Sequence, residues 1–370
     1  MKSLRYSVLL LAWVLLISCG EKEPVKVGFT SWLSGPNSVL GIAGRDAVEL
    51  AFDQVNEAGG INGRLVELVI KDDLGDAEQA VKGDRELIDA GCVAILGHMH
   101  SSMCIAALPQ INEQKILMIS PTASSDQLSG QDDYFFRIAP LASMEIEKLA
   151  KYAVDNLNLK NMVCVYDMSN QGYSERWNSD FNGELKKSGR SFIRSIPFNS
   201  VENPDYGKIA ESIMSAEPDG LLLVANSIST ALICQQLDKR DARIGLLSTG
   251  WANSDDFIQT GGPAVNGVTF AQARDLNSSG EKYRDFVDSF KESYNRAPDM
   301  ASIYSYEAAL VMIDLLKKTT DRDKLREELK STGRFDGLQQ DITFDAFGEN
   351  RQEEYFYLQV RDGKLVTINP

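Results

Sequence analysis

Short apolar segments alternate with longer amphipathic segments along most of the chain. The first such unit comprises a predicted strand at 25–30, a polar loop that contains Gly35 and Pro36, and a predicted helix at about 41–58. In this helix the apolar residues recur at helical spacing, at Val48, Ala51, Phe52 and Val55. Strands that alternate with helices are typical of a parallel sheet flanked by helices, so the pattern predicts an α/β fold.

The same alternation continues along the chain and restarts after Arg137, which indicates a second, similar lobe. Further strands are predicted at 66–71, 93–96, 116–119, 162–166, 192–196, 220–225, 244–247 and 267–271. Further helices are predicted at 77–90, from 101 toward 111, and at 143–157, 173–189, 280–295, 301–319 and 321–330. Near the end, 341–347 and 355–360 alternate about Gly348 and predict a β-hairpin.

The first residues have the pattern of an export signal. Lys2 and Arg5 precede an apolar run at 8–17 that is too short to span a bilayer. Cys19 follows this run in a context that resembles a bacterial lipoprotein signal. We expect residues 1–18 to be removed, Cys19 to carry the lipid and 19–24 to form a tether. An ordinary signal peptide with an incidental cysteine is the alternative.

Length and charge narrow the possible functions. The chain has 370 residues, 38 Lys and Arg against 53 Asp and Glu, and a formal net charge of -15. The length suggests two domains with ample core. Because affinity for nucleic acid comes largely from Lys and Arg that neutralise phosphates, this charge argues against nucleic acid as a partner.

The sequence lacks the common enzyme signatures. It contains no P-loop, no GxGxxG after the first strand, no HExxH and no GxSxG. Its two histidines, His98 and His100, lie near Cys104 and could form a soft-metal site, but loop neighbours that face opposite ways are the favoured interpretation. The adjacent pairs Asp72–Asp73 and Asp132–Asp133 are interpreted as solvated faces. We therefore expect no catalysis, no cofactor and no metal.

Polar residues follow several predicted strands where those strands end. Ligands of parallel sheets bind beyond the carboxyl ends of the strands, next to helix N-termini. Ser101 and Ser102 open the helix after strand 93–96, where they could receive a carboxylate or simply cap the helix. The other candidates, each of which could also be an ordinary loop or surface residue, are Thr122, Ser124, Ser125, Gln171, Tyr173 and Trp251.

A series of short motifs carries a family resemblance. They are Leu-Ser-Gly-Pro at 33–36, Val-Asn-Glu-Ala-Gly-Gly-Ile-Asn-Gly at 55–63, Lys-Asp-Asp at 71–73, Ile-Leu-Gly-His at 95–98, Ser-Ser at 101–102, Ile-Leu-Met-Ile-Ser-Pro at 116–121 and Tyr-Phe-Phe-Arg at 134–137. Together they resemble the type I periplasmic solute-binding proteins of ABC importers, in the leucine/isoleucine/valine-binding branch. The resemblance runs from Val25 to the C-terminus.

This resemblance implies two lobes of parallel sheet and helices, joined by three hinge crossings, with a ligand in the cleft between them. The crossings are expected near Pro140, Ala271 and Asp336. Lobe 1 is then expected to comprise 25–140 and 272–335, and lobe 2 to comprise 141–271 and 336–370.

The resemblance also implies a ligand site. The hydroxyl at Ser101 and the loop 122–124, with Thr122, Ala123 and Ser124, match positions that hold the carboxylate and amine of an amino-acid ligand in relatives. Positions of the second lobe match Gln171, Asn226 and Gly250. Three of the matched positions depart from the leucine-type pattern: Gly250 replaces an acidic residue that pairs with the ligand ammonium, and Leu40 and Gln171 replace tyrosines. Another acid must then receive an amine, or the ligand has none.

The relatives' disulfide positions fall on Gly75 and His100, so that bridge is not expected. The cysteines after Cys19 are interpreted mainly as buried small apolar residues, although a bridge between two of them stays open: Cys92, Cys104, Cys164 and Cys234. The disulfide of the relatives therefore has no counterpart at its own positions in this sequence.

The resulting prediction is a monomeric, lipid-anchored extracytoplasmic protein that captures a small carboxylate-bearing solute and presents it to an ABC permease and its ATPase subunits. Ser101, Thr122 and Ser124 are expected to hold the carboxylate, and Trp251 to cover the apolar part of the ligand. A sensory subunit that docks on a membrane receptor is the first alternative. An exported hydrolase is a remote second one.

Overall fold

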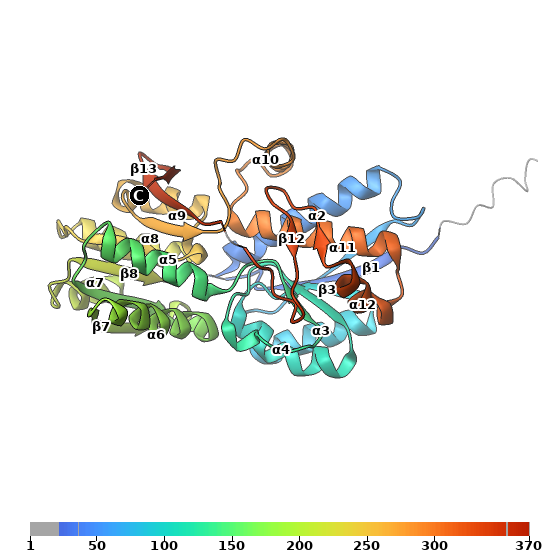
Figure 1. The fold of residues 1–370 in the computed structure, drawn as a ribbon, viewed down its shortest axis with the longest axis horizontal. Helices are drawn as coiled ribbons and strands as arrows, with labels where there is room; N and C mark the ends of the chain where they lie inside the picture. The colour runs from blue at the N-terminus through green and yellow to red at the C-terminus, as the bar shows by residue number, and fades with distance from the viewer. Residues whose placement is uncertain (1–21, 36, 353, 370) are drawn as a thin grey trace, which may run out of the picture.

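The computed structural model describes residues 22–35, 37–352 and 354–369 and shows two α/β lobes side by side (Figure 1). Cys19 and the predicted signal segment lie outside the described residues. Each lobe has a central sheet with helices on both faces. The α/β class predicted from the alternating pattern is confirmed.

The first lobe contains a five-stranded parallel sheet in the order β2-β1-β3-β4-β5. Its strands are β1 (Val25–Ser31), β2 (Val66–Asp72), β3 (Ala94–Gly97), β4 (Leu117–Ser120) and β5 (Phe135–Arg137). Its helices are α2 (Ser38–Glu57), α3 (Ala77–Asp89), α4 (Ser101–Gln114), α10 (Glu281–Tyr294), α11 (Met300–Lys318) and α12 (Arg322–Thr332). The last three come from the far end of the chain, so this lobe is discontinuous in sequence.

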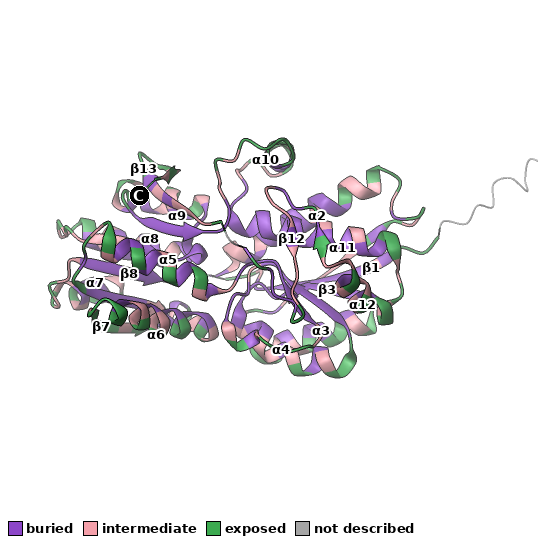
Figure 2. Ribbon diagram, viewed as in Figure 1, coloured by how far each residue is buried: buried purple, intermediate pink, exposed green. Residues whose placement is uncertain are grey.

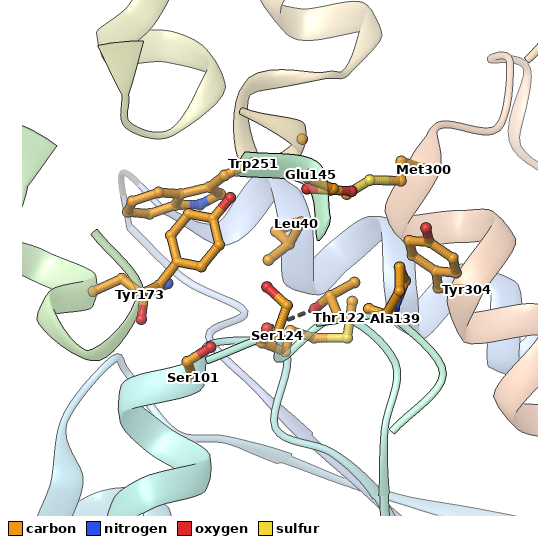
Figure 3. Close-up of a pocket in the computed structure, with 14 residues that line it drawn as sticks. Leu40, Ser101, Thr122, Ser124, Ala139, Glu145, Tyr173, Trp251, Met300 and Tyr304 are labelled. Atoms are coloured by element: carbon orange, nitrogen blue, oxygen red, sulfur yellow. Dashed lines mark hydrogen bonds between the residues drawn. The ribbon is translucent and has the colours of Figure 1, made fainter. Parts of the chain in front are cut away.

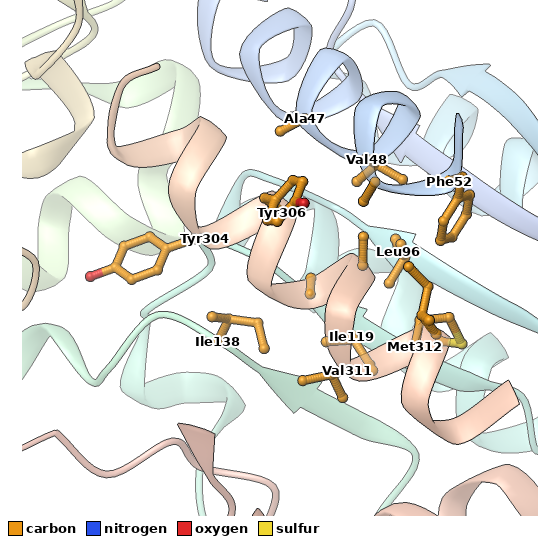
Figure 4. Close-up of a cluster of buried hydrophobic side chains, with 14 of the residues drawn as sticks. Ala47, Val48, Phe52, Leu96, Ile119, Ile138, Tyr304, Tyr306, Val311 and Met312 are labelled. Atoms are coloured by element: carbon orange, nitrogen blue, oxygen red, sulfur yellow. The ribbon is translucent and has the colours of Figure 1, made fainter. Parts of the chain in front are cut away.

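Alternate residues of the central strands face opposite layers of helices, as the pleat of a strand requires. In β3, Ala94 and Leu96 pack into the core beneath α2 and α11, whereas Ile95 packs beneath α3 and α4. Figure 4 shows the larger core, in which Val48 and Phe52 of α2 face Met312 of α11 above the sheet. Strands buried on both faces explain why the apolar runs of this sheet are short and continuous.

The second lobe contains a seven-stranded sheet in the order β14-β13-β10-β9-β8-β6-β7. Its strands are β6 (Asn161–Asp167), β7 (Ser191–Phe198), β8 (Gly220–Val224), β9 (Gly245–Ser248), β10 (Thr269–Gln272), β13 (Phe356–Arg361) and β14 (Lys364–Ile368). Its helices are α5 (Ala142–Asp155), α6 (Gln171–Lys187), α7 (Tyr206–Met214), α8 (Ser227–Asp238) and α9 (Asp255–Gly261). Strands β6 to β10 run parallel, and β13 and β14 add an antiparallel edge.

The predicted C-terminal hairpin between 341–347 and 355–360 is wrong, although an isolated antiparallel bridge joins Phe344 and Asn350 on either side of Gly348. Strand β12 (Ile342–Thr343) pairs with β11 (Arg334–Phe335), and β13 pairs with β14. The turn between β13 and β14 is Asp362–Gly363, where both residues have positive φ (49° and 71°). An Asp-Gly pair favours this two-residue turn, and that signal is stronger than the alternation about Gly348.

The chain passes between the lobes at three places. The first crossing lies between β5 and α5, where Pro140 was predicted to mark it, and the second follows β10, just beyond Ala271. The third was predicted near Asp336 but lies later, between β12 and β13. The reason is that Phe335, Leu338 and Ile342 are buried in the core of the first lobe, which keeps this segment there.

Burial follows the layers. In Figure 2 the central strands are almost entirely buried, whereas the edge strands β7 and β14 are largely exposed or half-buried, and most helices expose one face. Two buried ion pairs tie the crossings together: Arg137 pairs with Glu349 at 2.7 Å, and Arg274 pairs with Glu307 at 2.8 Å. Within the described ranges, the helices lack the length and apolar character needed to cross a membrane.

Candidate functional site

A cavity of about 450 Å³, counted to its open mouth, lies between the two lobes (Figure 3). It sits beyond the carboxyl ends of the parallel strands, where loops of both lobes and the N-termini of α4, α6 and α11 meet. The cavity is lined by Leu40, Met99, Ser101, Thr122, Ser124, Ala139, Pro140, Glu145, Asn170, Tyr173, Gly250, Trp251, Met300 and Tyr304.

The first lobe contributes a cluster of hydroxyls. Ser101 is the first residue of α4, whose N-cap is His100, and the His100 side chain makes no capping hydrogen bond. Ser101 Oγ accepts a hydrogen bond from the backbone N–H of Ser125 at 3.3 Å, and Thr122 Oγ1 donates to the Met99 carbonyl at 2.5 Å. Ser124 Oγ makes no hydrogen bond within the described part of the chain. Hydroxyls beside a helix N-terminus suit an anionic group.

The second lobe contributes aromatic walls. Trp251 follows β9 in a short 3₁₀ turn (Gly250–Ala252), and its ring meets Tyr173 edge-on, with centroids 5.9 Å apart. On its other side Trp251 meets His100 of the first lobe at 5.8 Å, and His100 in turn contacts Trp32 at 5.6 Å. The lobes therefore touch beside the cavity through a continuous row of rings.

Glu145 is the one charged residue among those that line the cavity. It lies in the first turn of α5, immediately after the first crossing, and its side chain is 7% exposed. In the described ranges its carboxyl makes neither a hydrogen bond nor an ion pair, and burial raises its pKa to about 8. Figure 3 places it next to Met300, across the cavity from Ser101.

Six of the ten residues predicted for the ligand site line this cavity: Ser101, Thr122, Ser124, Tyr173, Gly250 and Trp251. The other four have different surroundings. Ser102 bonds across the lobes to the backbone N–H of Gly172, and Gln171 is exposed at the start of α6. Ala123 is buried beneath the loop, and Asn226 caps α8 and donates to Asn37 at 2.5 Å.

The sequence interpretation did not select several lining residues, and Glu145 is the most informative of these. It falls at a position of α5 that continues the buried stripe of Leu149 and Ala153, so an acid on an apolar helix face was the available signal. Met300 and Tyr304 come from α11, a separate helix of the first lobe, and carry no local signal.

The two histidines do face opposite ways, as expected. His98 is fully buried between Asp73, 2.7 Å away, and Asp84, 3.2 Å away. Burial opposes its charge, but the two carboxylates outweigh this and raise the pKa of His98 to about 10. Asp73 was predicted to be solvated; this is wrong, since it is 1% exposed and its carboxylate is needed inside the lobe as a partner of His98.

The part of the chain that the structure describes contains neither a metal-binding cluster nor a disulfide. No three His, Cys, Asp or Glu side chains there are grouped to hold a metal ion. The four described cysteines are free and buried: Cys92, Cys104, Cys164 and Cys234. No two of these four cysteines therefore form a disulfide in this structure.

Comparison with known proteins agrees with this architecture. Residues 24–364 match the family described as periplasmic binding protein. A Leu/Ile/Val-binding protein homolog of Brucella melitensis is 24% identical over 96% of this chain and 95% of its own length. Two solved structures of solute-binding proteins share the fold. LivJ of Streptococcus pneumoniae in complex with isoleucine has a TM-score of 0.85 at 21% identity, covering 94% of this chain and 100% of its own.

The second structure is an ABC-transporter solute-binding protein of R. palustris in complex with benzoate. It has a TM-score of 0.84 at 20% identity, covering 93% of this chain and 95% of its own. The two-lobed fold, the cavity between the lobes and the family match over residues 24–364 lead to one conclusion. The chain belongs to the periplasmic binding protein family, whose members bind solutes and are not enzymes.

Proposed function

We propose that this protein captures a small carboxylate-bearing solute in the cavity between its lobes and delivers it to an ABC permease. The observation that carries the proposal is the lining of the cavity: Ser101, Thr122 and Ser124 stand on one lobe, and Tyr173 and Trp251 stand on the other. The hydroxyls and the N-terminus of α4 would hold the carboxylate, and Trp251 would cover the apolar part.

The ligands of similar proteins fit this chemistry. LivJ of S. pneumoniae was solved with isoleucine and the R. palustris protein with benzoate, and both ligands are small carboxylates with an apolar body.

Binding between two lobes also supplies the signal for delivery. A ligand that touches both lobes stabilises the closed arrangement by the difference between its affinities for the closed and open states. The permease would then recognise the closed form. Trp251, which contacts His100 across the cleft, would be buried further by the ligand.

Thermal unfolding against a panel of amino acids, their amides, and amine-free aliphatic and aromatic carboxylates tests the proposal. A ligand at a hundred times its dissociation constant adds about 2.7 kcal/mol of apparent stability. We expect at least one carboxylate to raise the midpoint in the wild type and to lose this effect in Ser124→Ala. Silence across the panel, or a response confined to the amides, would contradict the carboxylate assignment.

The proposal includes a lipid anchor at Cys19, which lies outside the described residues. It is supported by the basic start, the short apolar run and the cysteine that follows. A single lipid-bearing residue would keep the binding domain at the extracytoplasmic face of a membrane. Metabolic labelling with a fatty acid tests this: the label should enter the wild type and should be absent from Cys19→Ser, which should also leave the membrane fraction.

A further inference from the structure

We infer that Glu145 receives a positively charged ammonium group of the ligand, so that the site selects solutes carrying both a carboxylate and an amine, and that binding expels a proton from the Glu145 carboxyl. This inference rests on the proposed function. It assigns the ammonium-binding role to Glu145, whereas in leucine-type relatives the acid is expected at the position of Gly250.

The Glu145 carboxyl and two tyrosine hydroxyls are buried without hydrogen-bond partners among the described residues. The carboxyl lies at the wall of the cavity, 7% exposed, with no polar partner in the described residues. The hydroxyls of Tyr304 and Tyr355 are buried without partners in the same ranges. Buried polar groups in native proteins are nearly always paired, so Glu145 and Tyr304, which both line the cavity, call for a ligand group that can satisfy them.

The charge of the cavity indicates which group this is. No Lys, Arg or His is among the residues that line it, so Glu145 has no basic partner at the site. Arg274, a buried cation, lies over the ring of Tyr304 at 5.2 Å and is already paired with Glu307. A buried carboxylate needs a partner, and an ammonium group supplies both the charge and three hydrogen-bond donors.

The opposite wall has the complementary character. Figure 3 shows Ser101 and Ser124 across the cavity from Glu145. The N-terminus of α4 at Ser101 favours a negative group, so the two walls together fit a zwitterion.

Gly250 stands where an acid is expected in leucine-type relatives, and it carries no carboxylate. A Cβ there would lie 2.8 Å from Met300 Sδ, so this side chain takes up the space beside Gly250, and the acid of this site comes from another element.

Proton release follows from the protonation state of Glu145 before the ligand binds. The groups that face Glu145 are tyrosines from three other segments, Tyr173, Tyr304 and Tyr355, with Arg274 behind Tyr304. Burial raises the pKa of Glu145 to about 8, so its carboxyl is mostly protonated at pH 7. An adjacent ammonium favours the ionised form and lowers this pKa, which releases roughly one proton per ligand.

Two pairs of acids that differ only in the amine test the inference: L-leucine with 4-methylpentanoate, and 6-aminohexanoate with hexanoate. Affinities are measured by calorimetry at pH 7.2 in PIPES and in Tris, because proton release makes the measured enthalpy depend on the buffer. Wild type should bind the amino member of at least one pair about tenfold tighter or more, as loss of a buried charge pair implies, and its enthalpy should change with the buffer.

Glu145→Gln should abolish both the preference for the amine and the buffer dependence, and should keep its affinity for the amine-free acid. Glu147→Gln is the matched control, since Glu147 is exposed on the same helix, and it should behave as wild type. Glu145→Gln removes an unpaired buried acid, so urea unfolding should show no loss of stability.

Tighter binding of the amine-free members by wild type would overturn the inference and leave the proposed function standing, as would an unchanged preference in Glu145→Gln. Binding of neither member of either pair would count against both.

Discussion

Asn37 Nδ2 of the first lobe donates to Ser200 Oγ of the second at 3.0 Å, although 163 positions separate the two residues. The same amide donates to Ser169 Oγ at 2.9 Å and accepts from Asn226 at 2.5 Å. Asn37 precedes α2, yet its side chain makes no capping bond to that helix. Its side-chain hydrogen bonds therefore join the two lobes and stabilise the arrangement in which they are in contact.

We expect Asn37→Ala to weaken ligand affinity about tenfold, because it leaves buried partners unpaired only in the closed state. The folding stability of the first lobe should change little, since no helix cap is lost. Calorimetric titration with the best ligand of the panel measures the effect. Asn266→Ala, at an exposed position of the second lobe, is the control. Equal loss of affinity in both variants would refute a role for the Asn37 contacts.

His100 should make stability sensitive to acid. Its ring is buried between Trp32 and Trp251 with both nitrogens unpartnered among the described residues, and burial lowers its pKa to about 4. The unfolded chain, with a pKa near 6.5, binds the proton first, so this residue destabilises the native state as pH falls from 6.5 to 4. The full effect is about 3 kcal/mol.

His100→Phe keeps the aromatic packing and removes the titration. Urea unfolding of both proteins at several pH values between 7 and 4 isolates the residue, because all other groups are common to both. The free energy of unfolding of wild type relative to the variant should fall by about 3 kcal/mol across this window. A constant difference would show that His100 is not buried in the neutral form.

His98 changes the free energy of unfolding with pH in the opposite direction to His100. Its pKa of about 10 lies above the unfolded value, so its stabilisation is fully present below pH 6.5 and is lost as pH rises through 10. His98→Gln should cost about 3–5 kcal/mol at pH 7, because Asp73 and Asp84 are left buried without their cation. Urea unfolding measures this cost, and adding Asp84→Asn should recover part of it. A cost below 1 kcal/mol would mean that His98 is not charged.

Gly250 lies so close to Met300 that a Cβ added at position 250 would be 2.8 Å from Met300 Sδ. Gly250→Ala should weaken ligand affinity by less than tenfold, because Met300 Sδ is the far end of a flexible side chain and can shift away from the new Cβ. Met300→Ala in the same chain should restore part of the affinity. Titration of wild type, both single variants and the double variant gives the coupling. If Gly250→Ala bound the ligand with wild-type affinity, the close contact with Met300 would have no effect on binding.

The hydroxyl side of the cavity was predictable because it depends on local features. Ser101, Thr122 and Ser124 directly follow β3 and β4, and the carboxyl ends of neighbouring parallel strands meet at one sheet edge. Glu145 and Tyr304 depend instead on how the lobes are placed against each other. Their helices, α5 and α11, belong to different lobes. The end of α5 at Asp155 and the start of α11 at Met300 are 145 positions apart in sequence.

Some elements carry only weak sequence signals for a related reason. Helix α8 is buried on most sides and carries Ser227, Ser229 and Thr230 in its first turn, so neither a polar face nor an apolar stripe marks it. The third crossing, which the resemblance placed near Asp336, was placed too early. The apolar residues on either side of Asp336 in fact anchor the segment to the first lobe.

Helices α10, α11 and α12 complete the first lobe although they follow nearly all of the second in sequence. A growing chain therefore cannot finish either lobe in order of synthesis: the first waits for residues beyond 280, and the second for the edge strands β13 and β14. Until then the sheet face that α11 covers stays open to water. Translocation of an unfolded chain is compatible with this order, since both lobes complete their cores only with residues that follow position 280.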